Sequence, residues 1–251
     1  MAVLQRRRIL AMGVAALVMG LVTGRGFAAS DFRTEGCCLL NQKSGQEKDR
    51  VPPEERTLES SGDKNVDLML GRALVHLSSA FEVYPDFRFY DDRDGLNALA
   101  APFSLTHGTN GTVLFGVRLF HRQIDAHPDG DIAVLGICAH EFGHIVQYFS
   151  PYYKELRKGH RTVKLVELHA DFLAGYFVAL RRERFPDIQL QGLGEAWEAM
   201  GDVQYNAPGH HGTAAERVQA IEKGYFFGRD ESGDVRSAAK LGAQYVRENF
   251  S

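Results

Sequence analysis

A long apolar segment, residues 132–149, sets the first limit on how this chain folds, because it carries two histidines and a glutamate. Asp129-Gly130-Asp131 before the segment is typical of a helix start, and Pro151 after it is typical of a helix end. A helix that is apolar on most of its sides is normally buried. Ionisable groups in such a helix cost free energy unless they are paired or bind a metal. The segment therefore predicts a core helix that carries a polar site.

The polar groups of this segment form the motif His140-Glu141-Phe142-Gly143-His144. Residues at i and i+4 lie on one face of a helix, so the two imidazoles can bind one zinc ion. Glu141 lies beside them and can accept a proton from a water molecule at the metal. Cys138 faces away from His140, and we expect it to be a small buried apolar residue. The alternative interpretation is a pair of hydrogen-bonded core histidines.

A catalytic zinc ion takes three protein ligands, so a third ligand must come from another part of the chain. The metzincin arrangement is excluded, because Gln147 and Ser150 stand where it needs glycine and histidine. A second predicted helix, residues 161–185, places Glu167 and Asp171 on one face. We expect Glu167 to be the third ligand and Asp171 to accept the outer N–H of a ligand histidine.

Two alternatives concern this second helix. His169 points to nearly the opposite side of the helix and is the other candidate for the third ligand. A solvated polar face would explain Glu167 and Asp171 without a metal. The apolar residues on all sides of the helix argue against a solvated face.

Four segments carry a resemblance to a known family. They are HEFGHIVQ at 140–147, ELHADFLAGYF at 167–177, NALAAP at 97–102 followed by the strand GTVLFGV, and HGTAAERV at 211–218. In this order, and over roughly residues 65–227, the chain resembles the gluzincin superfamily of zinc peptidases. It is most similar to the neutral zinc metallopeptidases, which are related to the prenyl-protease-type peptidases.

The resemblance implies a role for each matching residue. His140, His144 and Glu167 match the zinc ligands, Glu141 the general base, and Asp171 the carboxylate that supports a ligand histidine. His211 matches a histidine that assists the oxyanion, and Arg217 an arginine that braces the ligand helix, expected to act through Asp171. The doubled His210-His211 leaves open which ring enters the site, and Tyr205 is a weaker candidate for the same work.

The rest of the pattern predicts an α+β fold that is mainly helical, and the resemblance implies a minigluzincin-like metallopeptidase domain. A small antiparallel sheet is expected beside the His-Glu-x-x-His helix, with an exposed edge next to the site. The strand at 112–117 is expected to bind an extended substrate by β-augmentation. The other predicted elements are helices at 65–81, 193–203, 213–226 and 234–249, a strand at 87–90 and a short strand or loop at 97–102.

The N-terminal residues 1–29 are typical of an export signal. Arg6-Arg7-Arg8 precedes an uncharged apolar run over residues 9–22, and Phe27-Ala28-Ala29 offers small residues for cleavage. The arginines also resemble a twin-arginine signal, and an uncleaved membrane anchor is the alternative. Residues 30–64 are predicted to be a flexible tether before a metallopeptidase domain at 65–251. Cys37 and Cys38 do not indicate a disulfide framework.

These features together predict an exported, periplasmic or secreted zinc endopeptidase that acts on a peptide or protein substrate. The formal net charge of −3 gives no basic surface for nucleic acid. A membrane partner is expected only if the N-terminal segment stays uncleaved. The alternatives are a catalytically silent zinc-binding or chaperone-like module on the same scaffold, and a cell-wall peptide amidase.

Overall fold

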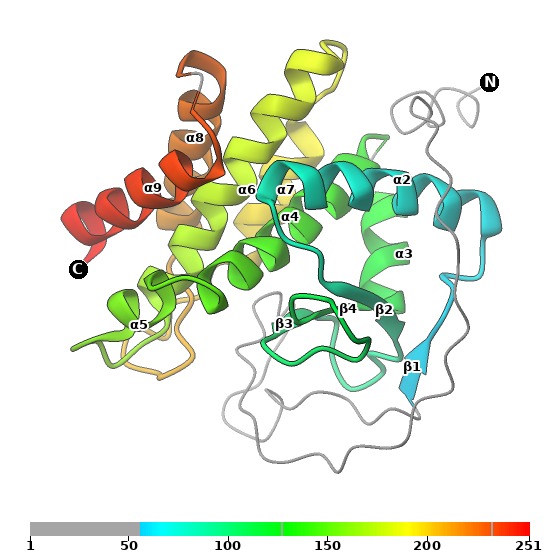
Figure 1. Ribbon diagram of the computed structural model, residues 1–251, viewed down its shortest axis with the longest axis horizontal. Helices are drawn as coiled ribbons and strands as arrows, with labels where there is room; N and C mark the ends of the chain where they lie inside the picture. Colours follow the sequence, from blue (N-terminus) through cyan, green and yellow to red (C-terminus); the bar gives the residue numbers. More distant parts are fainter. Residues whose placement is uncertain (1–55, 127, 232) are drawn as a thin grey trace.

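The computed structural model describes residues 56–126, 128–231 and 233–251. The described chain is mainly helical and has one small sheet (Figure 1), as the predicted α+β class requires. In chain order the elements are β1 (Thr57–Leu58), α2 (Lys64–Phe81), β2 (Asp86–Tyr90), β3 (Ala98–Ala101), β4 (Thr112–Gly116), α3 (Val117–Ala126), α4 (Gly130–Tyr148), α5 (Tyr152–Arg157), α6 (Lys164–Arg184), α7 (Gln191–Met200), α8 (Ala214–Asp230) and α9 (Val235–Phe250).

The sheet has the strand order β1-β2-β4-β3 and is mixed. β1 pairs with β2, and β3 with β4, in antiparallel fashion, whereas β2 and β4 are parallel. The prediction of an antiparallel sheet was therefore wrong for the central pair. The hairpin of β3 and β4 places its second strand against β2, and the alternation of apolar residues along a strand does not specify its neighbour.

Helices α4 and α6 form the centre of the fold, and both are buried over most of their length. The sheet lies on one side of α4, while α6, α8 and α9 lie on the other (Figure 1). Gly143 of α4 allows α6 to come close, because a Cβ at this position would lie 3.2 Å from the Ala170 Cα. The close crossing brings the polar face of α6 against the histidines of α4.

Helices α6 and α8 also pack closely through glycines. A Cβ on Gly175 would lie 1.9 Å from the Ile221 carbonyl oxygen, and one on Gly224 would lie 1.8 Å from that of Phe172. Only glycine fits where the two backbones meet at this distance. The contact fixes α8, and with it Arg217, behind the face of α6 that carries Asp171.

Helix α3 was not predicted, because its N-terminus depends on a residue far away in the sequence. The Asp92 carboxylate accepts the backbone N–H groups of Arg118 at 2.8 Å and Leu119 at 3.0 Å. These N–H groups have no partner inside the helix, so a remote carboxylate stabilises its start. The short helix α5 was also missed, since it lies between Pro151 and the expected start of the second helix.

Described residues before the expected domain start at residue 65 also take part in the fold. Thr57 and Leu58 pair with β2, and Asp63 caps α2 by accepting the N–H groups of Asn65 and Val66. The predicted export signal at 1–29, most of the predicted tether, Cys37 and Cys38 lie outside the described residues. Among the helices that are described, none is both long and apolar enough to cross a membrane.

Candidate metal centre

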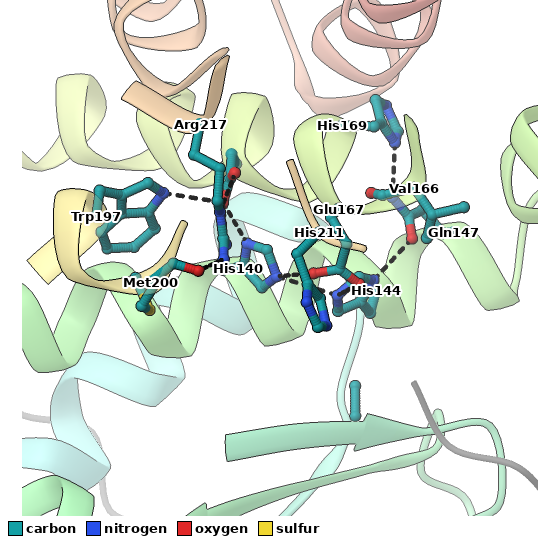
Figure 2. A network of polar contacts seen from close by, with 12 residues as sticks. His140, His144, Gln147, Val166, Glu167, His169, Trp197, Met200, His211 and Arg217 are labelled. Atoms are coloured by element: carbon teal, nitrogen blue, oxygen red, sulfur yellow. Dashed lines mark hydrogen bonds and ion pairs between the residues drawn. The ribbon is translucent and has the colours of Figure 1, made fainter. Parts of the chain in front are cut away.

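The side chains of His140, His144 and Glu167 meet between α4 and α6 (Figure 2). The two Nε2 atoms are 3.0 Å apart. Glu167 places one carboxylate oxygen 3.4 Å from His140 Nε2 and the other 3.4 Å from His144 Nε2. One ligand atom from each residue lies within 4.8 Å of the others, and all three side chains are fully buried. This is the convergence that the i, i+4 spacing on α4 and the face of α6 predict.

His140 is held from behind by Asp171. The outer ring nitrogen of His140, Nδ1, lies 2.7 Å from Asp171 Oδ1, which is the contact predicted from the sequence. The Arg217 guanidinium binds the same carboxylate and donates a further bond to the Met200 carbonyl at 3.2 Å. Trp197 Nε1 also donates to Asp171 Oδ1, at 2.9 Å. The carboxylate of Asp171 therefore accepts from three side chains and fixes the His140 ring.

His144 is held from behind by Gln147, which the sequence had not assigned a role. His144 Nδ1 lies 2.9 Å from Gln147 Oε1, and Gln147 Nε2 donates to the Val166 carbonyl at 2.7 Å. The spacing could have indicated this contact, because Gln147 lies three residues after His144 on the same helix and therefore on nearly the same face. Trp197 gave no comparable signal, because it reaches Asp171 from α7 and not from the ligand helices.

The charges of the cluster suit a cation. Burial on its own lowers the pKa of His144, but Glu167, Glu141 and the Gln147 hydrogen bond together raise it to about 9. Burial on its own raises the pKa of Glu167, but His144, His140 and His211 hold it well below its usual value. Neither Glu167 oxygen has a partner at hydrogen-bond geometry. Two buried imidazole nitrogens and an ionised carboxylate with unsatisfied oxygens are a donor set for a divalent metal.

The Asp171 carboxylate also stays ionised. Burial would raise its pKa, but Arg217 and His140 hold the pKa below its usual value. A charged Asp171 can accept a hydrogen bond from the Nδ1–H of His140, which leaves the Nε2 lone pair directed at the cluster. The residues that the sequence grouped together as ligands and supporting charges are therefore brought together by the fold.

The remaining predicted site residues lie around the cluster. Glu141 is fully buried, and its charge contributes to the raised pKa of His144. The His211 ring lies beside Glu167 and His144 (Figure 2), and its charge lowers the pKa of Glu167. Of the doubled histidines, it is therefore His211 that faces the cluster.

His210 has other partners. Its Nδ1 lies 2.5 Å from Asp202 Oδ1, and its ring packs against Tyr205 with the centroids 5.4 Å apart. Tyr205 itself is 61% exposed, and it contacts His210. Asp202 also accepts the backbone N–H of His211 at 2.8 Å. One carboxylate thus holds the two neighbouring histidines in different directions.

His169, the alternative third ligand, does not belong to the cluster. Its ring nitrogens lie 2.9 Å from Gln147 Nε2 and 2.9 Å from the Ala239 carbonyl oxygen. Burial lowers the pKa of His169 to about 4, so the ring is neutral at pH 7. The alternative was wrong because side chains two residues apart on a helix point to different sides.

Comparisons of the chain with protein-family models, with curated proteins and with solved structures gave no match. The resemblance to zinc peptidases therefore stays a prediction from the sequence motifs. The structure itself shows a buried cluster of His140, His144 and Glu167 that could hold a metal ion.

Proposed function

We propose that this chain is a zinc-dependent endopeptidase that hydrolyses peptide bonds with a water molecule and Glu141 as the general base. The convergence of His140, His144 and Glu167 is the observation that supports it most directly. Both histidines have an oxygen acceptor at Nδ1, so that Nε2 of each ring is directed at the cluster. Such outer contacts fix the tautomer and orientation of metal-binding histidines.

The donor set also suits iron(II), and it is the His-Glu-x-x-His arrangement, with Glu141 beside the two histidines, that favours zinc. Two imidazole nitrogens and one carboxylate are a ligand set of catalytic zinc sites, which keep one position open. When bound there, zinc supplies a Lewis acid that polarises a carbonyl group and makes a water molecule acidic near neutral pH. Structural zinc sites, by contrast, are closed by four protein ligands.

Three side chains would carry out the proton and charge chemistry. Glu141 would accept the proton of the attacking water and deliver it to the leaving amine. His211, beside Glu167, would donate a hydrogen bond to the oxygen on which negative charge develops. Asp202 Oδ2 accepts a hydrogen bond from the backbone N–H of His211 at 2.8 Å, and it lies 3.4 Å from the ring nitrogen Nδ1, so it orients the ring as well.

The edge of β3 would suit an extended peptide as substrate once the chain around its four buried residues moves. In the described part of the chain β3 pairs on one side only, with β4, and the Ala100 carbonyl of β3 lies 3.5 Å from the Tyr148 hydroxyl of α4. Pairing with a strand edge uses main-chain groups, so it selects peptides without selecting a sequence. The earlier expectation for residues 112–117 was wrong, because β4 has strand neighbours on both sides.

One observation favours the catalytically silent alternative. The three ligands and Glu141 are all fully buried, so a substrate reaches them only after the surrounding chain moves. A silent metal module needs no such movement. The presence of three ligands and not four among the described residues, together with the adjacent carboxylate of Glu141, favours the peptidase.

The proposal is tested by incubating the protein with a peptide library, with and without a chelator. Cleavage that stops with chelator and returns with zinc is expected for the wild type. Glu141→Gln should keep zinc content and lose hydrolysis, because the amide cannot accept the proton. Full zinc content without cleavage of any peptide would favour the silent module, and cleavage of cell-wall peptides alone would favour the amidase. Full activity in Glu141→Gln would remove Glu141 from the mechanism.

We also propose that residues 1–29 direct export to the periplasm or the medium. Mass measurement of the mature protein after expression in a bacterial host separates a cleaved signal from an uncleaved anchor. A mature N-terminus near residue 30 is expected, and an intact N-terminus in the membrane fraction would favour the anchor.

A further inference from the structure

A second series of buried polar contacts leads from His144 through Gln147 to His169 (Figure 2), and from there to helix α9. It continues from Gln147, whose Nε2 lies 2.9 Å from His169 Nδ1. The other nitrogen of His169, Nε2, lies 2.9 Å from the Ala239 carbonyl oxygen of α9. The side chains of His144, Gln147 and His169 are all fully buried.

One arrangement of protons satisfies all of these contacts. The Ala239 carbonyl only accepts, so His169 Nε2 carries the ring proton and Nδ1 accepts from Gln147. The amide of Gln147 then directs its NH₂ group to His169 and Val166, and its oxygen to His144. His144 must donate from Nδ1 to that oxygen. Whenever Nε2 of His144 carries no proton, as metal binding requires, its lone pair is thereby held toward His140 and Glu167.

Resting on the proposed zinc site, we propose that Gln147 and His169 are positioning residues for His144, and that they connect the metal centre to α9. His169 acts through Gln147 by fixing which way its amide points. Without that contact the Val166 carbonyl alone would hold the amide. The arrangement parallels the one behind His140, where Asp171 is fixed by Trp197 and Arg217.

Helix α9 lies directly on the His169 ring. A Cβ on Gly242 would lie 3.0 Å from His169 Cδ2 and 2.7 Å from Phe172 Cδ1. The missing side chain at Gly242 lets α9 approach closely enough for the Ala239 carbonyl to accept from His169. The position of α9 therefore affects the position of His144, one of the proposed metal ligands.

The test measures zinc affinity of the full-length protein by competition with a chromophoric chelator. Gln147→Met removes the acceptor opposite His144 and is expected to lower zinc affinity about 10- to 100-fold, the usual effect of losing an outer partner of a ligand. Gln147→Glu keeps an oxygen opposite His144 and should lose less affinity than Gln147→Met. His169→Phe should lower the affinity by a smaller factor than Gln147→Met, because the Val166 contact remains.

Gln123→Met is the matched control, since Gln123 is a buried glutamine on α3, outside the metal centre. It should leave zinc affinity unchanged. Wild-type zinc affinity in Gln147→Met, with only a lower unfolding temperature of the metal-free protein, would assign the contacts to packing and overturn the inference while the proposed function stands. A wild type that binds no zinc would overturn both. If Gln147→Met does not fold, unchanged affinity in His169→Phe overturns the connection to α9.

Discussion

Arg217 and Asp171 form a fully buried, two-point ion pair behind the candidate metal centre, with Nε and Nη2 of the guanidinium each 2.8 Å from a carboxylate oxygen. Asp171 in turn accepts from the outer nitrogen of His140. The geometry matches the planar fork of arginine, which lysine does not offer. Arg217 therefore links α8 to the ligand helix through a single carboxylate.

Replacing Arg217 with methionine should weaken both the fold and the metal site. The change leaves the buried Asp171 charge without its main partner, a loss that typically costs about 3–5 kcal/mol of unfolding free energy. Zinc affinity should also fall about 10- to 100-fold, because the support of His140 loosens. Denaturant unfolding in excess chelator measures the first effect, and chelator competition measures the second.

Arg229 provides the matched control for this variant. It binds Asp230 through the same two-point geometry, but both side chains are 53% exposed. Solvent screens such a pair, so Arg229→Met should leave unfolding and zinc affinity nearly unchanged. Equal effects in the two variants would contradict the role given to Arg217.

Gly143→Ala should separate α4 from α6 and weaken metal binding. The added Cβ would lie 3.2 Å from the Ala170 Cα and 3.3 Å from its Cβ, so α6 would have to shift by a few tenths of an ångström to relieve the contact. We expect a destabilisation of about 1–3 kcal/mol and lower zinc affinity, with Gly143→Val more severe. Zinc titration and denaturant unfolding measure the two effects.

Gly71→Ala on α2 is the control, because a Cβ there meets nothing within 4 Å. In an open helical position alanine should stabilise the protein by about 0.5–1 kcal/mol. Zinc affinity should not change. If Gly143→Ala also stabilised the protein, the close helix crossing would not explain how Glu167 reaches the histidines.

The core helices and the ligand cluster could be predicted from the sequence because both depend on local spacing. His140 and His144 are one turn apart, and the apolar residues around them specify a buried helix. What could not be predicted depends on contacts between distant segments. Asp92 starts α3 from outside the helix, and β4 enters the sheet between β2 and β3.

The residues that support the candidate ligands also differ in whether local spacing or distant contacts determine their role. Asp171 was predicted because it shares a helix face with Glu167. The contact of His169 with Ala239 was not, since it depends on where α9 packs. Local periodicity thus identifies the candidate ligands, whereas the tertiary packing decides what holds them in place.

Asp131, in the first turn of α4, should make stability depend on pH. Its Oδ2 is buried without a hydrogen-bond partner, and burial, with the nearby Asp129 charge, raises its pKa from 3.8 to about 6. The folded state therefore binds the proton more tightly than the unfolded state. The ionised form destabilises the fold. The contribution of Asp131 to the free energy of unfolding therefore falls as the pH rises from about 4 to 6, and it does not change further at higher pH.

Asp131→Asn should raise the unfolding free energy by about 1–3 kcal/mol at pH 7, since one pKa unit corresponds to about 1.4 kcal/mol. The gain should disappear near pH 4, where the wild-type carboxyl is also neutral. Denaturant unfolding of both proteins at pH 4, 5 and 7 measures the difference. A gain of the same size at all three values would show that charge burial is not its cause.

The two adjacent histidines should differ sharply in their effect on catalysis. His211 lies beside Glu167, whereas His210 is held by Asp202 and packs on Tyr205. His211→Ala should lower kcat about 100-fold or more, the range for loss of one donor to a developing oxyanion, with zinc content unchanged. His210→Ala keeps that donor and should reduce kcat much less.

Asp202→Ala releases both rings and should resemble His211→Ala in kcat. Steady-state kinetics on a cleaved library peptide, with zinc content measured for each variant, distinguishes these outcomes. A larger loss in His210→Ala than in His211→Ala would reverse the assignment, because the exposed loop would then present the other ring to the substrate.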